Sequence, residues 1–418
     1  MKNIRAIITV LGMNLAALST MVVLPISHAV AAEEQKVSAK VGKPLQEALK
    51  AGQDKQWDKV LAKLNEAQAV SEKTPFEEFK INEIYSWYYI QQKKYGDAAG
   101  VYEKQLNSGF LSAADTDLYT KQIAQMYLQT KNNAKASEYI QRWLKSHPND
   151  TDMTAVLAQL QYQSGQLKQS LDTLNGLVSN SEKAGQRPKE EWLTLMYGAS
   201  YQVAGKPNPL DKATLNVVEK LLRYYPKENY WLAYLGGLKS QQMSDGNRFQ
   251  LDRLMLAVGT LKESDDFIGL AQLANNAGYP GEGLAVLDSG YAKGILGTPA
   301  GKEREDRLKA SMSKLADADK ASLPALDKKA RAAATGQDDA VLGEAYMGYA
   351  RYPEAIEALE RGIKKGGLKK PDQAQIALGI SYLRSGQADK AKAAFKQVDA
   401  DGELGRIASL WTLHANSK

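Results

Sequence analysis

The sequence repeats itself at a spacing of 34 to 36 residues, and this repetition constrains the fold more than any other feature. Ala136 and Ser170 are equivalent residues 34 positions apart, and Ala355 and Ala391 are equivalent residues 36 positions apart. The two clearest copies share a Leu-Gly pair, a tyrosine, an alanine and a bulky residue: Leu342, Gly343, Tyr346, Ala355 and Leu359, then Leu378, Gly379, Tyr382, Ala391 and Phe395. A unit this short cannot bury its own apolar face, so we expect consecutive units to stack.

The spacing of the repeated residues predicts two helices in each unit. Leu378 and Tyr382 are four residues apart, as are Ala391 and Phe395, which places each pair on one face of a helix. Gly379 and Ala391 are small, and we expect them where the two helices of a unit approach most closely. Glycines follow several first helices, where they suit a turn: Gly165, Gly205 and Gly386. No stretch alternates with a sustained period of two, so no strands are expected.

These residues resemble the tetratricopeptide repeat (TPR) family, whose units carry the Leu-Gly and Tyr positions on a first helix and the Ala position on a second. The resemblance covers most of residues 41–402. It implies an all-α fold in which helix-turn-helix repeats stack into a right-handed superhelical solenoid. The expected parts are a signal peptide at 1–32, an N-terminal TPR array at 33–226, divergent helical repeats at 227–299, a polar helical bridge at 300–335, a C-terminal TPR pair at 336–402 and a capping helix at 403–418.

Two of these parts are predicted from composition and periodicity. Residues 300–335 are rich in Ala, Lys, Arg and Asp and include Pro324, so we expect a pair of polar helices that bridges the two arrays. Leu404, Ile407, Leu410 and Trp411 form one amphipathic stripe. A helix with such a stripe suits the end of a solenoid, because the last repeat otherwise exposes its core.

The N-terminus has the layout of a secretory signal peptide. Lys2 and Arg5 precede a charge-free apolar run at 6–26, and small residues at 29–32 come before Glu33. We expect cleavage between Ala31 and Glu33, which gives a periplasmic or secreted protein of Gram-negative type, without membrane insertion. The apolar run is about long enough to span a bilayer, so an uncleaved membrane anchor is the alternative.

Residue types and patterns that the sequence lacks argue against several other classes of function. There is no cysteine, which excludes disulfides, thiolate metal sites and cysteine nucleophiles. The three histidines, His28, His147 and His414, do not have metal-ligand spacing. The charges that give a net +6 are interspersed by sign, without the basic stripe typical of nucleic-acid binding. We therefore predict a non-enzyme with no catalytic residues, metal or cofactor and no nucleic-acid partner. The alternative is a cell-envelope enzyme whose active site cannot be recognised from sequence motifs.

The TPR resemblance also implies a groove lined by first-helix residues that lie off the packing stripe. Counting from unit starts at Phe79, Asp117 and Thr151, we define the groove positions as the fifth, ninth, twelfth and thirteenth residues. They are Glu83, Trp87, Ile90 and Gln91; Lys121, Gln125, Leu128 and Gln129; and Ala155, Gln159, Tyr162 and Gln163. Glutamine recurs among them, and amides both donate and accept hydrogen bonds, which suits the backbone of an extended peptide.

Trp87 is the predicted binding hot spot on this face. It lies two residues from both Tyr85 and Tyr89, and two residues turn a helical side chain by about 200°. Trp87 is therefore expected to face the groove or solvent, where tryptophan often dominates binding energy. The competing interpretation is that Trp87 packs on the next unit and is structural.

A weaker resemblance concerns the pathway. The segment 37–45 and the turn 294–297 are similar to periplasmic TPR proteins found alongside TonB-type transport systems. This resemblance implies a protein or peptide partner in the cell envelope that takes part in nutrient uptake across the outer membrane.

Overall fold

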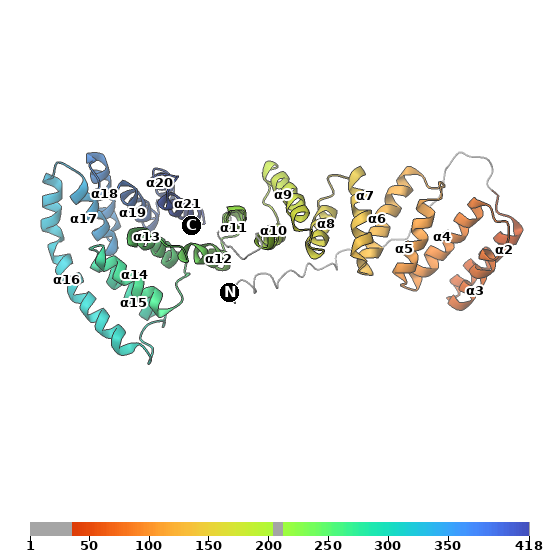
Figure 1. The fold of residues 1–418 in the computed structure, drawn as a ribbon, viewed down its shortest axis with the longest axis horizontal. Helices are drawn as coiled ribbons and strands as arrows, with labels where there is room; N and C mark the ends of the chain where they lie inside the picture. The colour runs from red at the N-terminus through yellow and green to blue at the C-terminus, as the bar shows by residue number, and fades with distance from the viewer. Residues whose placement is uncertain (1–35, 204–211, 418) are drawn as a thin grey trace. The chain divides into compact units, whose positions relative to one another are not determined.

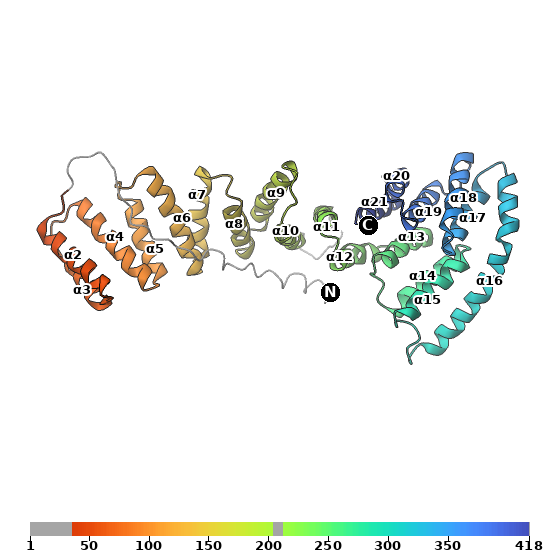
Figure 2. The ribbon, with the colours of Figure 1, turned by 180° about the vertical axis from the view of Figure 1, so that it is seen from behind.

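The computed structural model describes residues 36–203 and 212–417, and every regular element in these ranges is a helix (Figures 1 and 2). No strand occurs in the described residues, which confirms the all-α repeat solenoid predicted from the sequence. These residues form two compact units, an N-terminal unit at 36–203 and a C-terminal unit at 212–417.

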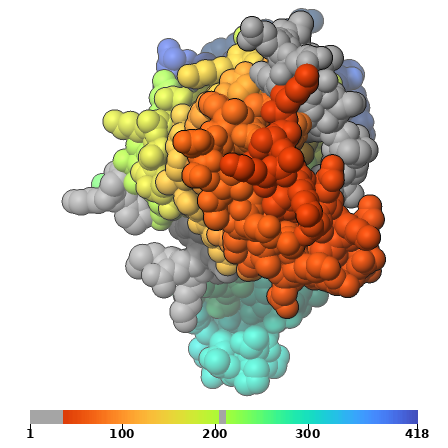
Figure 3. Space-filling view, turned by 90° about the vertical axis from the view of Figure 1, so that its right-hand side faces the viewer, coloured from red at the N-terminus to blue at the C-terminus, as the bar shows by residue number. Residues whose placement is uncertain are grey.

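The N-terminal unit is a row of helix pairs. Its helices are α2 (Ala39–Gln53), α3 (Trp57–Gln68), α4 (Pro75–Gln91), α5 (Tyr95–Leu106), α6 (Ala113–Gln129), α7 (Asn133–Ser146), α8 (Thr151–Gln163), α9 (Leu167–Lys183) and α10 (Glu190–Val203). In the four pairs from α2 to α9, each first helix packs on the second helix of its own pair, and that second helix packs on the next first helix, the last of which is α10. Figure 3 looks onto the end of this unit that α2 and α3 form.

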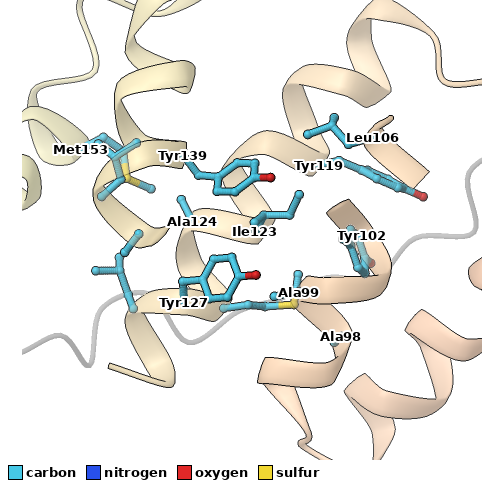
Figure 4. Packing of buried hydrophobic residues seen from close by; sticks show 14 of the residues in the cluster. Ala98, Ala99, Tyr102, Leu106, Tyr119, Ile123, Ala124, Tyr127, Tyr139 and Met153 are labelled. Atoms are coloured by element: carbon cyan, nitrogen blue, oxygen red, sulfur yellow. The ribbon is translucent and has the colours of Figure 1, made fainter. Parts of the chain in front are cut away.

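The apolar core of this unit runs between the pairs. In Figure 4, Ile123 and Ala124 of α6 lie among the rings of Tyr119, Tyr127 and Tyr139, and both are fully buried. The equivalent small residue of the second helix, Ala136, is fully buried too. The pattern residues that predicted this unit thus form its core.

A carboxylate fixes the start of the row. Glu77 and Thr74 form a capping box at the start of α4, and the backbone N–H of Ser38 also donates to Glu77 at 2.8 Å. Hydrogen bonds from Ser38 and Thr74 lower the pKa of Glu77 to about 2. One ionised side chain therefore ties the residue before α2 to the first turn of α4.

Tyrosine hydroxyls link successive pairs in addition to the apolar packing. The hydroxyl of Tyr85 on α4 donates to Asn65 Oδ1 on α3 at 2.7 Å. The hydroxyl of Tyr382 likewise donates to Glu360 on the second helix of the pair before it. Each tyrosine lies on a first helix, so the residue that the repeat pattern uses for packing also holds the preceding pair.

The C-terminal unit holds the remaining helices. They are α11 (Lys212–Tyr224), α12 (Glu228–Lys239), α13 (Asp245–Ala257), α14 (Ser264–Asn276), α15 (Pro280–Ala292), α16 (Lys302–Ala332), α17 (Gln337–Gly348), α18 (Tyr352–Lys365), α19 (Pro371–Arg384), α20 (Ala388–Phe395) and α21 (Glu403–Ala415). The sequence assigned 212–224 to the N-terminal array, whereas α11 groups with this unit.

The polar bridge is one helix, and the prediction of a helix pair was wrong. α16 runs for 31 residues from Lys302 to Ala332 and passes through Pro324, which is exposed. Its buried apolar residues are Met312, Ala316, Leu323 and Ala330. Their spacings of four and seven residues keep one face of the helix against the unit on both sides of the proline. A proline removes one hydrogen bond of a helix, and this packing outweighs that loss.

The expected close approach of the two helices within a pair is confirmed in the C-terminal unit. A Cβ atom added to Gly379 would lie 2.3 Å from the ring of Phe395, and one added to Gly343 would lie 2.5 Å from Leu359. These two glycines are equivalent positions of successive repeats. Ala391, on the facing helix, has no exposed surface.

Replacing Ala391 by leucine is therefore expected to lower the free energy of unfolding by about 1–3 kcal/mol, because the larger side chain overpacks this contact. Ala388→Leu is the matched control, since Ala388 begins the same helix and is only half-buried. Urea denaturation of both variants measures the difference. Equal losses in the two variants would show that the repeat register is wrong.

Candidate functional site

The predicted glutamine ladder lies on three consecutive first helices. Gln91, Gln129 and Gln163 are the last residues of α4, α6 and α8, and all three are exposed. One turn earlier, Gln125 and Gln159 are half-buried on α6 and α8. The fold thus places the amides at matching positions of neighbouring pairs, as the register predicted.

Trp87 is partly buried and packs on the pair before its own, so its ring is not a fully open binding surface. Its ring packs against α2, where a Cβ added to Gly52 would lie 2.2 Å from it. The ring also lies 5.7 Å from that of Trp57 on α3, measured between centroids. The rotation of about 200° does turn Trp87 away from Tyr85, but the preceding pair covers that side as well. Ile90 is half-buried against the core cluster formed by α5 to α8.

Tyr162 connects two first helices. Its hydroxyl accepts a hydrogen bond from the side-chain amide of Gln202 on α10. A Cβ added to Gly198 would lie 3.2 Å from the same hydroxyl, so a side chain larger than glycine would crowd it. Gln202 is exposed and has the same register position as Tyr162 in the next unit, counted from Tyr197 and Gly198. The sequence prediction omitted Gln202, although extending the register by one unit identifies it.

Lys121 is neutralised within the unit. Its ammonium lies 3.3 Å from Asp150 Oδ2 and 4.7 Å from the centroid of the Trp143 ring. Trp143 Nε1 donates to the same carboxylate oxygen at 2.9 Å, and the N–H of Met153 donates to the other oxygen at 3.0 Å. Although burial opposes it, these hydrogen bonds hold the pKa of Asp150 below its usual range. Lys121 therefore positions α8 rather than presenting a free charge to an anionic ligand.

The face that remains accessible is neutral and rich in amides. It comprises Gln91, Gln125, Gln129, Gln159, Gln163 and Gln202, with Tyr162 between them. We call these residues the amide face. The side chain of Gln163 accepts a hydrogen bond from Asn133 Nδ2 at 3.4 Å. This contact is long and solvent-exposed, so a bound ligand could displace it. Carboxamides can bond both the N–H and the C=O groups of a peptide.

Two further features concern the described part of the chain. Within it, no group of three or more His, Asp or Glu side chains is arranged to hold a metal ion. No helix there is both long enough and apolar enough to cross a membrane. The predicted signal peptide at 1–32 and the turn at Gly205 lie outside the described residues.

The fold and its close-contact positions define a class of protein, the helix-turn-helix repeat proteins. Residues 341–404 match the sequence model of the tetratricopeptide repeat family. This chain carries tetratricopeptide repeats, and proteins built from them generally serve as non-catalytic protein-interaction scaffolds.

Solved structures align loosely with the chain. A tetratricopeptide repeat protein from Parabacteroides merdae is 10% identical, with 82% of this chain and 99% of that one covered and a TM-score of 0.28. The TPR domain of P58(IPK) is 12% identical, with 91% and 99% covered and a TM-score of 0.24. A structure of Naa15/Naa10 bound to HypK-THB is 14% identical with a TM-score of 0.34; 90% of this chain aligns, spanning 62% of that chain. No curated protein matches the sequence.

Proposed function

We propose that this protein is a non-catalytic scaffold of the cell envelope that holds an extended peptide segment of a partner protein on the amide face of its N-terminal unit. The observation that supports this most directly is the placement of Gln125 and Gln159 at the same register position of adjacent pairs, both partly accessible. A peptide crossing α6 and α8 would meet one carboxamide from each helix. Such an arrangement binds backbone groups, so it tolerates different side chains.

The neutrality of this face indicates which ligands it disfavours. Lys121 is paired with Asp150, and Lys80 is paired with Glu83 at 2.7 Å. A terminal carboxylate or a phosphate would find no unpaired cation at these positions. The proposed ligand is therefore an internal, uncharged stretch of polypeptide.

The cell-envelope location rests on the N-terminal sequence. Lys2, Arg5, the apolar run at 6–26 and the small residues at 29–32 support export followed by cleavage before Glu33. N-terminal sequencing of the protein from an envelope fraction tests this; an intact Met1 in membranes would establish the anchored form instead. The resemblance of 37–45 and 294–297 to TonB-associated proteins makes outer-membrane nutrient uptake the pathway we propose.

Photo-crosslinking tests the peptide-binding face. A photoreactive residue at Gln125 or Gln159 is expected to give a defined adduct in the native envelope. The matched control is Gln141, an exposed glutamine on α7, the second helix of the same pair as α6. Adducts of equal yield from Gln141, or none from Gln125 and Gln159, would contradict binding at the amide face.

A further inference from the structure

The groove positions of the C-terminal TPR pair are more deeply buried than their counterparts in the N-terminal unit. The same register, started at Gly336 and Asp372, makes Glu344 and Ile380 the ninth residues of their units. They are 7% and 6% exposed, whereas the ninth residues Gln125 and Gln159 are half-buried. Another part of the C-terminal unit therefore covers the ninth positions of α17 and α19.

Helix α13 contacts this face through a buried arginine. Arg253 Nη1 lies 3.0 Å from Glu344 Oε2 on α17, and Arg253 Nη2 lies 2.6 Å from Glu282 Oε2 on α15. The guanidinium stacks on Phe249, with its central carbon 3.9 Å from the ring centroid. A guanidinium shared by two carboxylates in a dry site has little freedom to reorient, so it fixes α13 against both helices.

The other end of α13 contacts α19 and α21. Asn247 Nδ2 donates to Glu403 Oε2, the first residue of α21, at 2.6 Å. A Cβ atom added to Gly246 would lie 2.9 Å from the side-chain nitrogen of Gln373 on α19. α13 also packs along α21, as Figures 1 and 2 show. Every residue from 249 to 255 is buried, so the middle of α13 is covered on all sides.

We propose that α13 is an internal ligand of the C-terminal TPR pair and that Arg253 is the latch that holds it there. The first-helix face of α17, α19 and α21 is then closed to external peptides while α13 is docked. This leaves the first-helix face of the N-terminal unit as the binding surface of the resting protein. A partner reaches the C-terminal face only after α13 has left it.

Thiol labelling tests this occupancy, because the natural chain has no cysteine. Three single-cysteine variants of the full chain, Ile380→Cys, Gln125→Cys and Ala391→Cys, are treated with a maleimide, each with and without Arg253→Met. Ile380→Cys reports on the covered face, and Gln125→Cys reports on the equivalent open position. Ala391→Cys reports on unfolding of the pair itself, since Ala391 is fully buried between α19 and α20.

Arg253→Met leaves the buried carboxylate of Glu344 and the partly buried carboxylate of Glu282 without their cation. It is expected to speed labelling at Ile380→Cys on the order of 100-fold, with little change at Ala391→Cys or Gln125→Cys. Equal acceleration at Ile380→Cys and Ala391→Cys would show that α13 is an inseparable part of the core. No acceleration at Ile380→Cys would show that α13 does not cover it. Either result overturns the proposal.

Glu344→Gln is the milder second variant, because the amide keeps the shape and Glu282 still neutralises Arg253. It is expected to accelerate labelling at Ile380→Cys less than Arg253→Met does, again without exposing Ala391→Cys. The labelling requires no partner, so its outcome is independent of whether the amide face binds peptide. The crosslinking at Gln125 can in turn succeed or fail whatever the state of α13.

Discussion

Replacing Trp411 by alanine is expected to lower the free energy of unfolding of the C-terminal unit by about 3–5 kcal/mol, as is typical when a buried large aromatic side chain is removed. Trp411 is 1% exposed on α21, and its ring stacks with that of Phe395 at 5.9 Å between centroids. The indole therefore closes the end of the last TPR pair. Loss of the indole leaves a cavity beside Phe395, and the packed helices around it cannot move close enough together to fill it.

Urea denaturation with a tyrosine-sensitive and a helix-sensitive signal measures this loss. Ser409→Ala is the control, because Ser409 is exposed on the same helix and its replacement should change stability by less than about 0.5 kcal/mol. A Trp411→Ala protein within about 1 kcal/mol of the parent would mean that α21 is not required to close the unit.

Asp252→Asn is expected to stabilise the C-terminal unit at neutral pH by on the order of 2–3 kcal/mol. Asp252 lies on α13, is 7% exposed, and its Oδ1 atom is buried without a hydrogen-bond partner. Burial raises the pKa of this carboxyl to about 6, although Arg248 and Lys239 oppose the rise. Nearby Asp266 acts in the same direction as burial.

The sign of the pH dependence follows from the raised pKa. The folded state holds the proton of Asp252 more tightly than the unfolded chain, where a carboxyl titrates near its ordinary value of about 3.9. The contribution of protonated Asp252 to the stability of the folded state is therefore complete below a pH of about 3.9 and is lost as the pH rises through about 6. Asparagine is neutral throughout, so urea denaturation between pH 4 and 8 should show a gain for Asp252→Asn only toward the upper end.

Asp245→Asn makes the same charge change at an exposed site on the same helix, where α13 begins. It should give no comparable gain at neutral pH, since an acidic residue in the first turn favours the helix dipole. If Asp252→Asn stabilised the unit equally at pH 4 and pH 8, the ionisation of Asp252 would not be the cause.

The sequence predicted the parts of the fold that repeat. Gly343 and Gly379 are close-contact residues because every unit of this kind brings two helices together at that point. The turns were predicted less completely. Gly165 and Gly386 have φ values of 78° and 79°, but Lys93 and Lys131 take the same left-handed conformation at equivalent turns, with φ of 55° and 57°. A search for glycine misses such turns, because the surrounding helices can impose this conformation on other residues.

The candidate site was predictable only as far as local register determines it. Position along a helix correctly grouped Gln125 with Gln159. It could not show that Trp87 meets Gly52, because that contact depends on how closely α2 approaches α4. Arg253 was missed altogether, since its partner Glu344 is 91 residues away and Arg253 lies in a stretch with a poor repeat signature.

The contacts of α13 also bear on the order in which the chain can fold during synthesis. In the N-terminal unit each pair packs on the next, so its contacts are local in sequence and can form as the residues emerge from the ribosome. Asn247, by contrast, meets Glu403 across 156 residues. α13 packs on α12 and α14 early, but it cannot reach its final environment until α17 and α21 have been made. Of the two units, the C-terminal one is therefore expected to complete its folding only after nearly all of its helices have been synthesised.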